Sequence, residues 1–426
     1  MLDINKVINH PEEVRAALVK RMLPDVLDTA LAKIIKLDGE RRQLIAEADS
    51  LKAERNSHSK TKPTPEVIKQ MKAVGEKIKE LDARLKTVEE ELKEEMAALP
   101  NMPAADVVAG EKENNKVLRT FGKQPKFKFT PKDHVELATS LGIIDYERAA
   151  KMSGAGFWVY RGLGAQLEWA LLNYFVDFHL QNKYTFIIPP YLLTEQSAYT
   201  SGHLPKFRDD LFWTQDNLCL NATSEMMLGN YHRDEILNEA DLPIKYFAYS
   251  ACFRREAGAY RKEERGMVRG HQFNKIEMFH FTKPTGSDAA LEELVKNAEK
   301  LVDGLGLHFQ SVLLAAGDAS AAMAKTIDIE AWIPSMGIYK EVSSASNATD
   351  YQARRGNIRY KKEMVNKENL AIHKIEFVHT LNASGLATSR IVPAILEQFQ
   401  QKDGSVEIPK VLRKYMGGVK RIEIKQ

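Results

Sequence analysis

The sequence of 426 residues predicts an α+β protein in two parts: an N-terminal antiparallel α-helical coiled-coil hairpin, then a larger body on an antiparallel β-sheet flanked by helices. Near the N-terminus, apolar residues recur every three or four positions with charged residues between them, which predicts the hairpin. Further along the chain, short strand-like runs interleave with amphipathic helical patterns. This mixture predicts the sheet and its covering helices.

The second helix of the hairpin has the clearer pattern. Its apolar seam alternates steps of four and three through Val67, Met71, Val74, Ile78, Leu81, Leu85, Val88 and Leu92. An earlier stretch from Ala30 to Leu51 keeps a similar register, although Arg41 and Arg55 interrupt it. Two prolines and small polar residues at 57–65 end one helix before the next begins. A dimerising coiled coil or a pair of solvated helices is the alternative interpretation of this region.

Prolines and turn formers at 99–103, followed by a polar stretch through Gly122, end the helical pattern. We therefore expect an N-terminal domain at 1–103, a linker at 104–122 and a second domain at 123–426. The elements expected in the second domain are helices at 166–181 and 289–305 and strands at 184–188, 246–253, 275–281, 326–333 and 375–379.

Bulk composition limits the class of protein only loosely. The chain has 61 Lys+Arg against 58 Asp+Glu, a net charge of +3, so affinity for nucleic acid must come from local clusters of basic residues. Two cysteines, Cys219 and Cys252, are too few for a disulfide framework or a Cys-rich zinc site. The N-terminus lacks the pattern of a signal peptide, and no apolar run reaches ~18 residues. We expect a cytoplasmic protein with no membrane partner.

The block at 252–277 carries the strongest chemical signal. Two strand-like runs flank a basic loop, and neither a P-loop nor a Rossmann glycine pattern occurs in the chain. Arg254 and Arg269 supply forked, permanently charged donors that suit phosphate oxygens, and Phe273 offers a ring for stacking. Taken alone, such a block is more often an exposed hairpin with salt bridges.

The order of residues in this block, Phe253-Arg254-x-Glu256 through Arg269-x-His271-Gln272-Phe273, resembles motif 2 of class II aminoacyl-tRNA synthetases in the seryl form. Further segments resemble the other markers of that family in the expected order. These are motif 1 at 184–190, the Thr-x-Glu motif at 223–225, the ATP and magnesium strand at 341–355, motif 3 at 382–390 and the C-terminal signature at 406–416. The resemblance covers essentially the whole chain, hairpin included.

The resemblance implies an enzyme, a homodimeric serine:tRNA ligase that forms seryl-adenylate from serine and ATP and transfers the seryl group to tRNA. The implied tRNA partner is tRNA(Ser), with tRNA(Sec) as a further candidate, and the implied cofactor is Mg²⁺. Residues 123–426 would form the catalytic domain and residues 1–103 would bind tRNA. Basic residues of the hairpin that would contact tRNA are Arg55, Lys60, Lys62, Lys69 and Lys72.

Site roles are carried over one position at a time. The implied catalytic residues are Arg254 and Arg390. ATP would be bound by Arg254, Glu256, Arg269, Phe273, Glu341, Val342, Ser343, Ser344 and Arg390. Serine would be bound by Thr223, Ser224, Glu225, Arg254, Glu277, Asn382 and Ser384. The metal ligands would be Glu341 and Ser344, oxygen donors of the kind that a hard cation prefers. We assign His271 no catalytic role.

The chain departs from the family pattern in three places. Ser389 and Ala383 replace glycines near motif 3, and both add a side chain where the backbone would approach ATP. The segment 260–264 replaces a smaller, glycine-containing part of the motif 2 loop, so contacts with pyrophosphate or with the tRNA acceptor end would differ. Two alternatives stay open: a ligase that loads an amino acid onto a carrier protein, and a non-catalytic RNA-binding regulator.

Overall fold

The computed structural model describes residues 1–58, 64–256, 266–365 and 371–424. It divides into two compact units, Met1–Met102 and Pro103–Gln426. Two of the predicted tRNA-binding residues, Lys60 and Lys62, lie outside the described residues, as does the departing segment 260–264 of the motif 2 loop. Within the part that is described, no helix is long and apolar enough to cross a membrane.

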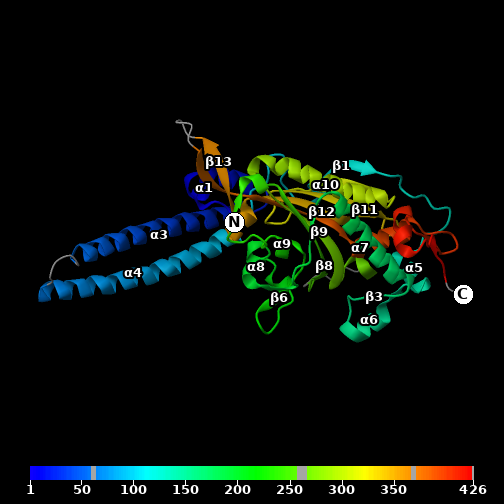
Figure 1. The fold of residues 1–426 in the computed structure, drawn as a ribbon, viewed down its shortest axis with the longest axis horizontal. Helices are drawn as coiled ribbons and strands as arrows, with labels where there is room; N and C mark the ends of the chain where they lie inside the picture. The colour runs from blue at the N-terminus through cyan, green and yellow to red at the C-terminus, as the bar shows by residue number, and fades with distance from the viewer. Residues whose placement is uncertain (59–63, 257–265, 366–370, 425–426) are drawn as a thin grey trace. The chain divides into compact units, whose positions relative to one another are not determined.

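The N-terminal unit contains α1 (Ile4–Asn9), α2 (Pro11–Leu18), α3 (Pro24–His58) and α4 (Pro65–Ala98). Helices α3 and α4 lie side by side as an antiparallel hairpin, which confirms the predicted coiled-coil arm (Figure 1). Every position of the predicted seam in α4 is buried or half-buried.

Ion pairs between α3 and α4 follow the antiparallel order. Lys33 pairs with Glu95 at 2.6 Å, and Glu40 pairs with Arg84 at 2.7 Å further along the hairpin. Such surface pairs contribute only about 0–1 kcal/mol each, so the apolar seam supplies most of the stability of the hairpin. The pairs are consistent with a single register of the two helices.

The larger unit is built on an eight-stranded sheet in the order β1-β10-β11-β12-β15-β9-β8-β4. All neighbours are antiparallel except β4 and β8, which confirms the predicted fold class. The strands are β1 (Lys116–Phe121), β4 (Thr185–Ile187), β8 (Ile244–Phe253), β9 (Gln272–Thr282), β10 (Phe309–Leu313), β11 (Lys325–Ile333), β12 (Ile338–Thr349) and β15 (His379–Ala387). The first of these, β1, lies within the segment 104–122.

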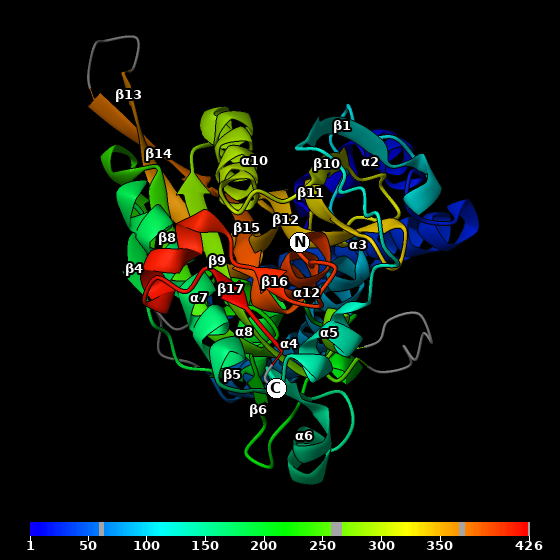
Figure 2. The ribbon, with the colours of Figure 1, turned by 90° about the vertical axis from the view of Figure 1, so that its right-hand side faces the viewer.

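Three helices pack apolar side chains against this sheet: α7 (Leu163–Gln181), α10 (Ser287–Gly304) and α12 (Thr388–Gln398). Figure 2 shows α7 and α10 beside the strands of the sheet. Side chains alternate between the two faces of a strand. On β9, Ile276 and Met278 therefore join the core with the helices, while Lys275 and Glu277 line a cleft on the other face.

A smaller sheet has the order β14-β13-β7, from β7 (Ile236–Asn238), β13 (Arg359–Val365) and β14 (Ala371–Phe377). The strand predicted at 375–379 is divided between two sheets, because β14 ends at Phe377 and β15 of the large sheet begins at His379. The remaining elements named as helices or strands are α5 (His134–Ser140), β2 (Ile144–Asp145), α6 (Tyr146–Ser153), β3 (Val159–Tyr160), β5 (Leu192–Thr194), α8 (Glu195–Thr200), β6 (Leu218–Leu220), α9 (Glu225–Leu228), α11 (Tyr351–Gly356), β16 (Val406–Glu407) and β17 (Arg421–Ile422).

Candidate active site

A polar cleft lies over the centre of the large sheet, where β8, β9, β15 and β12 are neighbours. It contains three adjoining cavities that share side chains. We name them the amino-acid cavity of about 160 Å³, the stacking cavity of about 40 Å³ and the acidic cavity of about 290 Å³. Glu341 lines all three, and Arg254 lines the first two. The shared residues make the cleft one continuous site.

The amino-acid cavity brings together most of the residues that were assigned to serine from the sequence. Those that line it are Thr223, Glu225, Arg254, Glu277, Asn382 and Ser384. They come from the start of α9, the end of β8, and strands β9 and β15, which lie side by side in the sheet. Asn382 Nδ2 donates to Glu277 Oε1 at 2.9 Å, which fixes one oxygen of that buried carboxylate.

A buried lysine, Lys275, lines this cavity and contacts two of its other residues. Lys275 Nζ lies 2.5 Å from Glu277 Oε2 and donates to Thr223 Oγ1 at 2.7 Å. No role for Lys275 was predicted from the sequence. Its position two residues before Glu277 on β9 puts both side chains on the cleft face, and that strand alternation was the available signal.

Glu225 is held by a second chain of hydrogen bonds. Gln352 Nε2 donates to Glu225 Oε1 at 2.7 Å, and Thr380 Oγ1 donates to Gln352 Oε1 at 2.7 Å. Burial and the nearby Glu277 carboxylate raise the pKa of Glu225 to about 7, although Lys275 acts in the opposite direction. The cavity thus presents two carboxylates and one buried lysine, which contacts Glu277.

The stacking cavity is lined by several charged or aromatic side chains, among them Arg254, Glu256, Arg269, Phe273 and Arg390. The Arg254 guanidinium lies 5.1 Å from the centre of the Phe273 ring, and Arg269 Nη2 lies 2.5 Å from Glu256 Oε2. An aromatic face bordered by guanidinium groups suits a planar base that carries phosphates.

His271 supports the backbone beside this cavity. Its Nδ1 donates to the Arg254 carbonyl oxygen at 3.0 Å, and the Arg254 amide donates to the His271 carbonyl oxygen at 2.9 Å. These bonds fix the backbone from which the Arg254 side chain projects. A structural role of this kind accounts for the histidine without any part in proton transfer.

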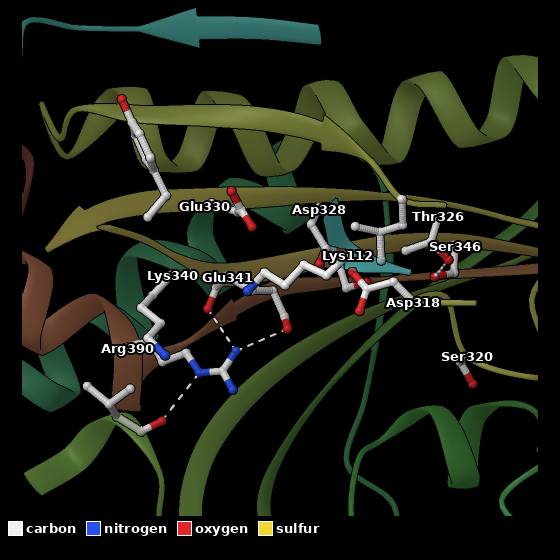
Figure 3. A pocket seen from close by; sticks show the side chains of 14 residues that line it. Lys112, Asp318, Ser320, Thr326, Asp328, Glu330, Lys340, Glu341, Ser346 and Arg390 are labelled. Atoms are coloured by element: carbon white, nitrogen blue, oxygen red, sulfur yellow. Dashed lines mark hydrogen bonds and ion pairs between the residues drawn. The ribbon is translucent and has the colours of Figure 1, made fainter. Parts of the chain in front are cut away.

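The acidic cavity gathers carboxylates beside basic groups (Figure 3). Arg390 Nη1 lies 3.1 Å from Glu341 Oε2 and donates to the Glu341 carbonyl oxygen at 2.9 Å. Partial burial raises the pKa of Glu341, but Arg390 and Arg254 outweigh that effect and hold the pKa below its ordinary value. Figure 3 also shows Lys112 and Lys340 near these carboxylates.

Asp328 is a further carboxylate of the acidic cavity that the sequence analysis missed. It stands on β11 opposite Ser344 of β12, and its Oδ1 is buried without a hydrogen-bond partner in the structure. Burial and the neighbouring Glu341 raise the pKa of Asp328. The signal in the sequence was the polar residue between Ile327 and Ile329, which both face the core.

Three residues assigned to the site from the sequence do not line these cavities. Ser224 Oγ is buried 2.7 Å from Ser250 Oγ, and Ser343 Oγ donates to the Ser384 carbonyl oxygen at 2.6 Å. The Val342 side chain belongs to the hydrophobic core. The structure therefore places these three side chains behind the cleft.

The two departures from the glycine pattern differ in their positions. Ala383 alternates with Asn382 and Ser384 on β15, so its methyl group lies in the core, away from the cleft. Ser389 lines the stacking cavity, where it follows Thr388 at the start of α12. Only the serine adds a side chain to the cleft.

Family models and curated relatives match most of the chain. Residues 1–103 match the model of the seryl-tRNA synthetase N-terminal domain, and residues 206–399 match that of the tRNA synthetase class II core domain (G, H, P, S and T). Serine--tRNA ligase 2 of Clostridium acetobutylicum is 52% identical, over 98% of this chain and 99% of the relative. The serine--tRNA ligase of Caldicellulosiruptor bescii is 47% identical, over 98% and 99% respectively.

Two solved structures resemble the whole chain. The seryl-tRNA synthetase from Pyrococcus horikoshii complexed with ATP has a TM-score of 0.91 at 34% identity and covers 100% of both chains. The cytoplasmic serine-tRNA ligase from Naegleria fowleri in complex with AMP has a TM-score of 0.87 at 31% identity, covering 100% of this chain and 99% of the other.

Proposed function

The chain belongs to the seryl-tRNA synthetase family, and on that premise we propose that its cleft activates serine with ATP and transfers the seryl group to tRNA. It is an ATP-dependent aminoacyl-tRNA ligase. The observation that carries the site assignment is the continuity of the amino-acid and stacking cavities at Arg254. Two substrates that react with each other need such adjoining sites.

In the first step a serine carboxylate oxygen attacks the α-phosphorus of ATP and pyrophosphate leaves. We place the α-phosphate and the serine carboxylate at Arg254, whose charge offsets the negative charge that builds up during attack. The adenine ring would lie between Phe273 and Arg390, with its amino group donating to Glu256. Arg269 would reach the γ-phosphate, so the Arg269–Glu256 pair has to open when ATP binds. No general base is needed, since the carboxylate is already ionised.

The serine side of the reaction is assigned to the amino-acid cavity. The carboxylates of Glu225 and Glu277 would face the substrate ammonium and hydroxyl, while Thr223 and Ser384 complete the wall. A buried pocket that hydrogen-bonds a hydroxyl rejects analogues without it, because its own polar groups are left unpaired. Selectivity for serine over alanine follows from this arrangement.

Magnesium fits the acidic cavity. Glu341 and Ser344 would hold the ion, and the unpartnered Oδ1 of Asp328 lies on the neighbouring strand. Among the described residues no group of three or more His, Cys, Asp or Glu side chains could hold a metal. Mg²⁺ often takes one or two carboxylates together with substrate phosphates, so triphosphate oxygens would complete its shell. The ion would neutralise phosphate charge and orient the triphosphate.

In the second step the terminal ribose hydroxyl of tRNA attacks the seryl-adenylate carbonyl and AMP leaves. A fourth cavity of about 460 Å³ opens beside the amino-acid cavity and shares Arg254 with it. His203 and Phe207 line this opening, which offers the tRNA end a route to the reacting carbonyl.

We assign tRNA binding to the N-terminal domain, residues 1–103, and catalysis to residues 123–426, with 104–122 between them. Arg55, Lys69 and Lys72 are exposed on the hairpin, as phosphate contacts require. Lys60 and Lys62 keep the same assignment. The substrate is tRNA(Ser), and tRNA(Sec) is a further candidate.

A homodimer is supported by apolar side chains that the single chain leaves exposed on α7 and directly after β4. Trp169 and Leu180 of α7 are 59% and 50% exposed, and Ile188, directly after β4, is 73% exposed. Burial of such side chains against a second copy would remove apolar surface from water. Light scattering tests this proposal: the mass of one chain, 48.2 kDa, would refute it.

We place the enzyme in the cytoplasm. Cys219 and Cys252 are both free and buried, as is usual for proteins of a reducing compartment. Fractionation of the source cell tests this location.

Serine-dependent exchange of labelled pyrophosphate into ATP tests the proposed reaction directly. The assay reports formation of seryl-adenylate without any tRNA. Exchange should require serine, ATP and Mg²⁺ together. Its absence in the folded protein would refute activation of serine, whereas exchange without charging of tRNA would refute only the second step.

A further inference from the structure

Glu168 of α7 is a buried carboxylate behind the stacking cavity and has no part in the reaction described above. Its side chain is only 4% exposed. Asn274 Nδ2 donates to Glu168 Oε1 at 2.8 Å, and Thr388 Oγ1 donates to the same oxygen at 2.6 Å. Among the described residues no Lys or Arg pairs with it. Burying a carboxylate that is held only by hydrogen bonds costs free energy of folding. The presence of Glu168 at this buried position therefore needs an explanation.

The Glu168 carboxylate lies near the point where the pairing of β15 with β9 ends. Strands β15 and β9 pair from His379 to Ala387, with an irregularity after Ser384, and the last pair is Ala387 with Lys275. Asn274 lies just beyond that pair on β9, and Thr388 just beyond it at the start of α12. Glu168 therefore joins the two chain segments at the point where the backbone ladder ends.

Those two segments carry the walls of the stacking cavity. Phe273 directly precedes Asn274, and Arg390 follows Thr388 by two residues. Phe273 and Arg390 both line the stacking cavity. The other side of the Asn274 amide is also fixed, because Tyr249 Oη donates to its Oδ1 at 3.1 Å.

We propose that Glu168 is a positioning residue that sets the separation of Phe273 and Arg390, and thereby the fit of the adenine ring between them. This inference rests on the proposed ATP site. It adds a role for a residue that touches neither substrate. Because Thr223, Glu225 and Glu277 are held by bonds that do not include Glu168, we expect the amino-acid cavity to keep its arrangement when Glu168 is replaced.

The test compares Glu168→Ala with Glu168→Gln. The alanine variant loses two hydrogen bonds to a charged group. Because these bonds position Phe273 and Arg390, the loss of their free energy should raise KM for ATP about 10-fold or more in pyrophosphate exchange. KM for serine should stay within about twofold. The glutamine variant keeps an amide oxygen that accepts both bonds, so it should restore KM for ATP to near the wild-type value.

Glu299→Ala is the matched control for simple destabilisation. Glu299 is a buried carboxylate of α10 that accepts from Ser311 Oγ at 2.6 Å and Arg119 Nε at 2.9 Å, away from the cleft. Its loss should lower the Tm without changing KM for ATP. Should Glu168→Ala not fold, Thr388→Val removes one of the two donors with little change in shape, together with the longer bond from the same hydroxyl to the Asn274 carbonyl oxygen at 3.1 Å, and should reproduce the ATP-selective loss.

Equal increases in both KM values, or an unchanged KM for ATP in folded Glu168→Ala and Thr388→Val, would overturn the proposal. Calorimetric binding of a non-hydrolysable ATP analogue gives a second measurement that does not need catalysis. If the wild-type protein binds the analogue but shows no serine-dependent exchange, the proposed function fails, while the comparison of analogue affinities still tests the role of Glu168.

Discussion

The affinity for serine is expected to depend on pH, because the Glu225 carboxylate titrates near neutrality. Burial and the neighbouring Glu277 raise its pKa to about 7. A carboxyl group with that pKa is ionised in about one molecule of eleven at pH 6 and in about ten of eleven at pH 8. Since the ionised form attracts the serine ammonium, the Kd for serine should be about tenfold higher at pH 6 than at pH 8.

Calorimetric titration of serine between pH 6 and pH 8 measures this dependence. Burial lowers the pKa of His203, at the edge of the amino-acid cavity, to about 3, so that histidine does not titrate in this range. Glu225→Gln is the control variant: its serine affinity should be weaker and independent of pH. A wild-type Kd that is the same at pH 6 and pH 8 would refute the assignment of Glu225 to the ammonium.

Three further outcomes are expected. Arg254→Ala should fold but exchange pyrophosphate ~10²-fold more slowly, because a preorganised charge at the reacting phosphate is lost; near-normal kinetics contradict that role. Alanine should be activated far more poorly than serine, and comparable kcat/KM values for both rule out the pocket assignment. Replacing residues 30–92 with a short flexible linker should preserve pyrophosphate exchange and raise KM for tRNA, since the acceptor end loses its anchor. An unchanged KM shows that the hairpin does not hold tRNA.

The hairpin could be predicted in detail because its signal is local. Heptad spacing specifies which face of a helix is buried, and α4 begins at Pro65, one of the two prolines that predicted a break between the helices. The partner of each helix followed from chain order, since a short connection favours antiparallel neighbours. Asp38 was not expected to be buried; it is only 2% exposed and pairs with Arg41 and Arg42 within the same helix.

The sheet was harder to predict, since pairing joins residues that are far apart in the sequence. The run 375–379 reads as one strand, yet β14 and β15 belong to different sheets, with no glycine or proline between them. The strand β1 was hidden in a polar stretch, because an edge strand with exposed side chains lacks the apolar alternation of a half-buried strand.

The same limit applies to the site. Family resemblance pointed to residues inside motifs, and most of these line one cleft. Lys275, Gln352 and Asp328 were missed because their importance depends on contacts with residues distant in the sequence: Thr223, Glu225 and Ser344, respectively. The full-length relatives support the synthetase interpretation, and they give no support to the carrier-protein ligase or the regulator.

The charged side chains of the amino-acid cavity suit a zwitterionic ligand. Two carboxylates, Glu225 and Glu277, share a single buried lysine, and Lys275 lies against Glu277. Burial and the Glu277 carboxylate raise the pKa of Glu225, and the positive charges of Lys275 and Arg254 offset this rise only in part. In the proposed binding mode a substrate ammonium would add a positive charge beside these carboxylates and so offset the cost of burying them. The Arg254 guanidinium lines the same cavity and offers the opposite charge to the substrate carboxylate. An α-amino acid in its zwitterionic form therefore balances the cavity at both ends, whereas an amine or an acid alone would leave one charged group without a partner.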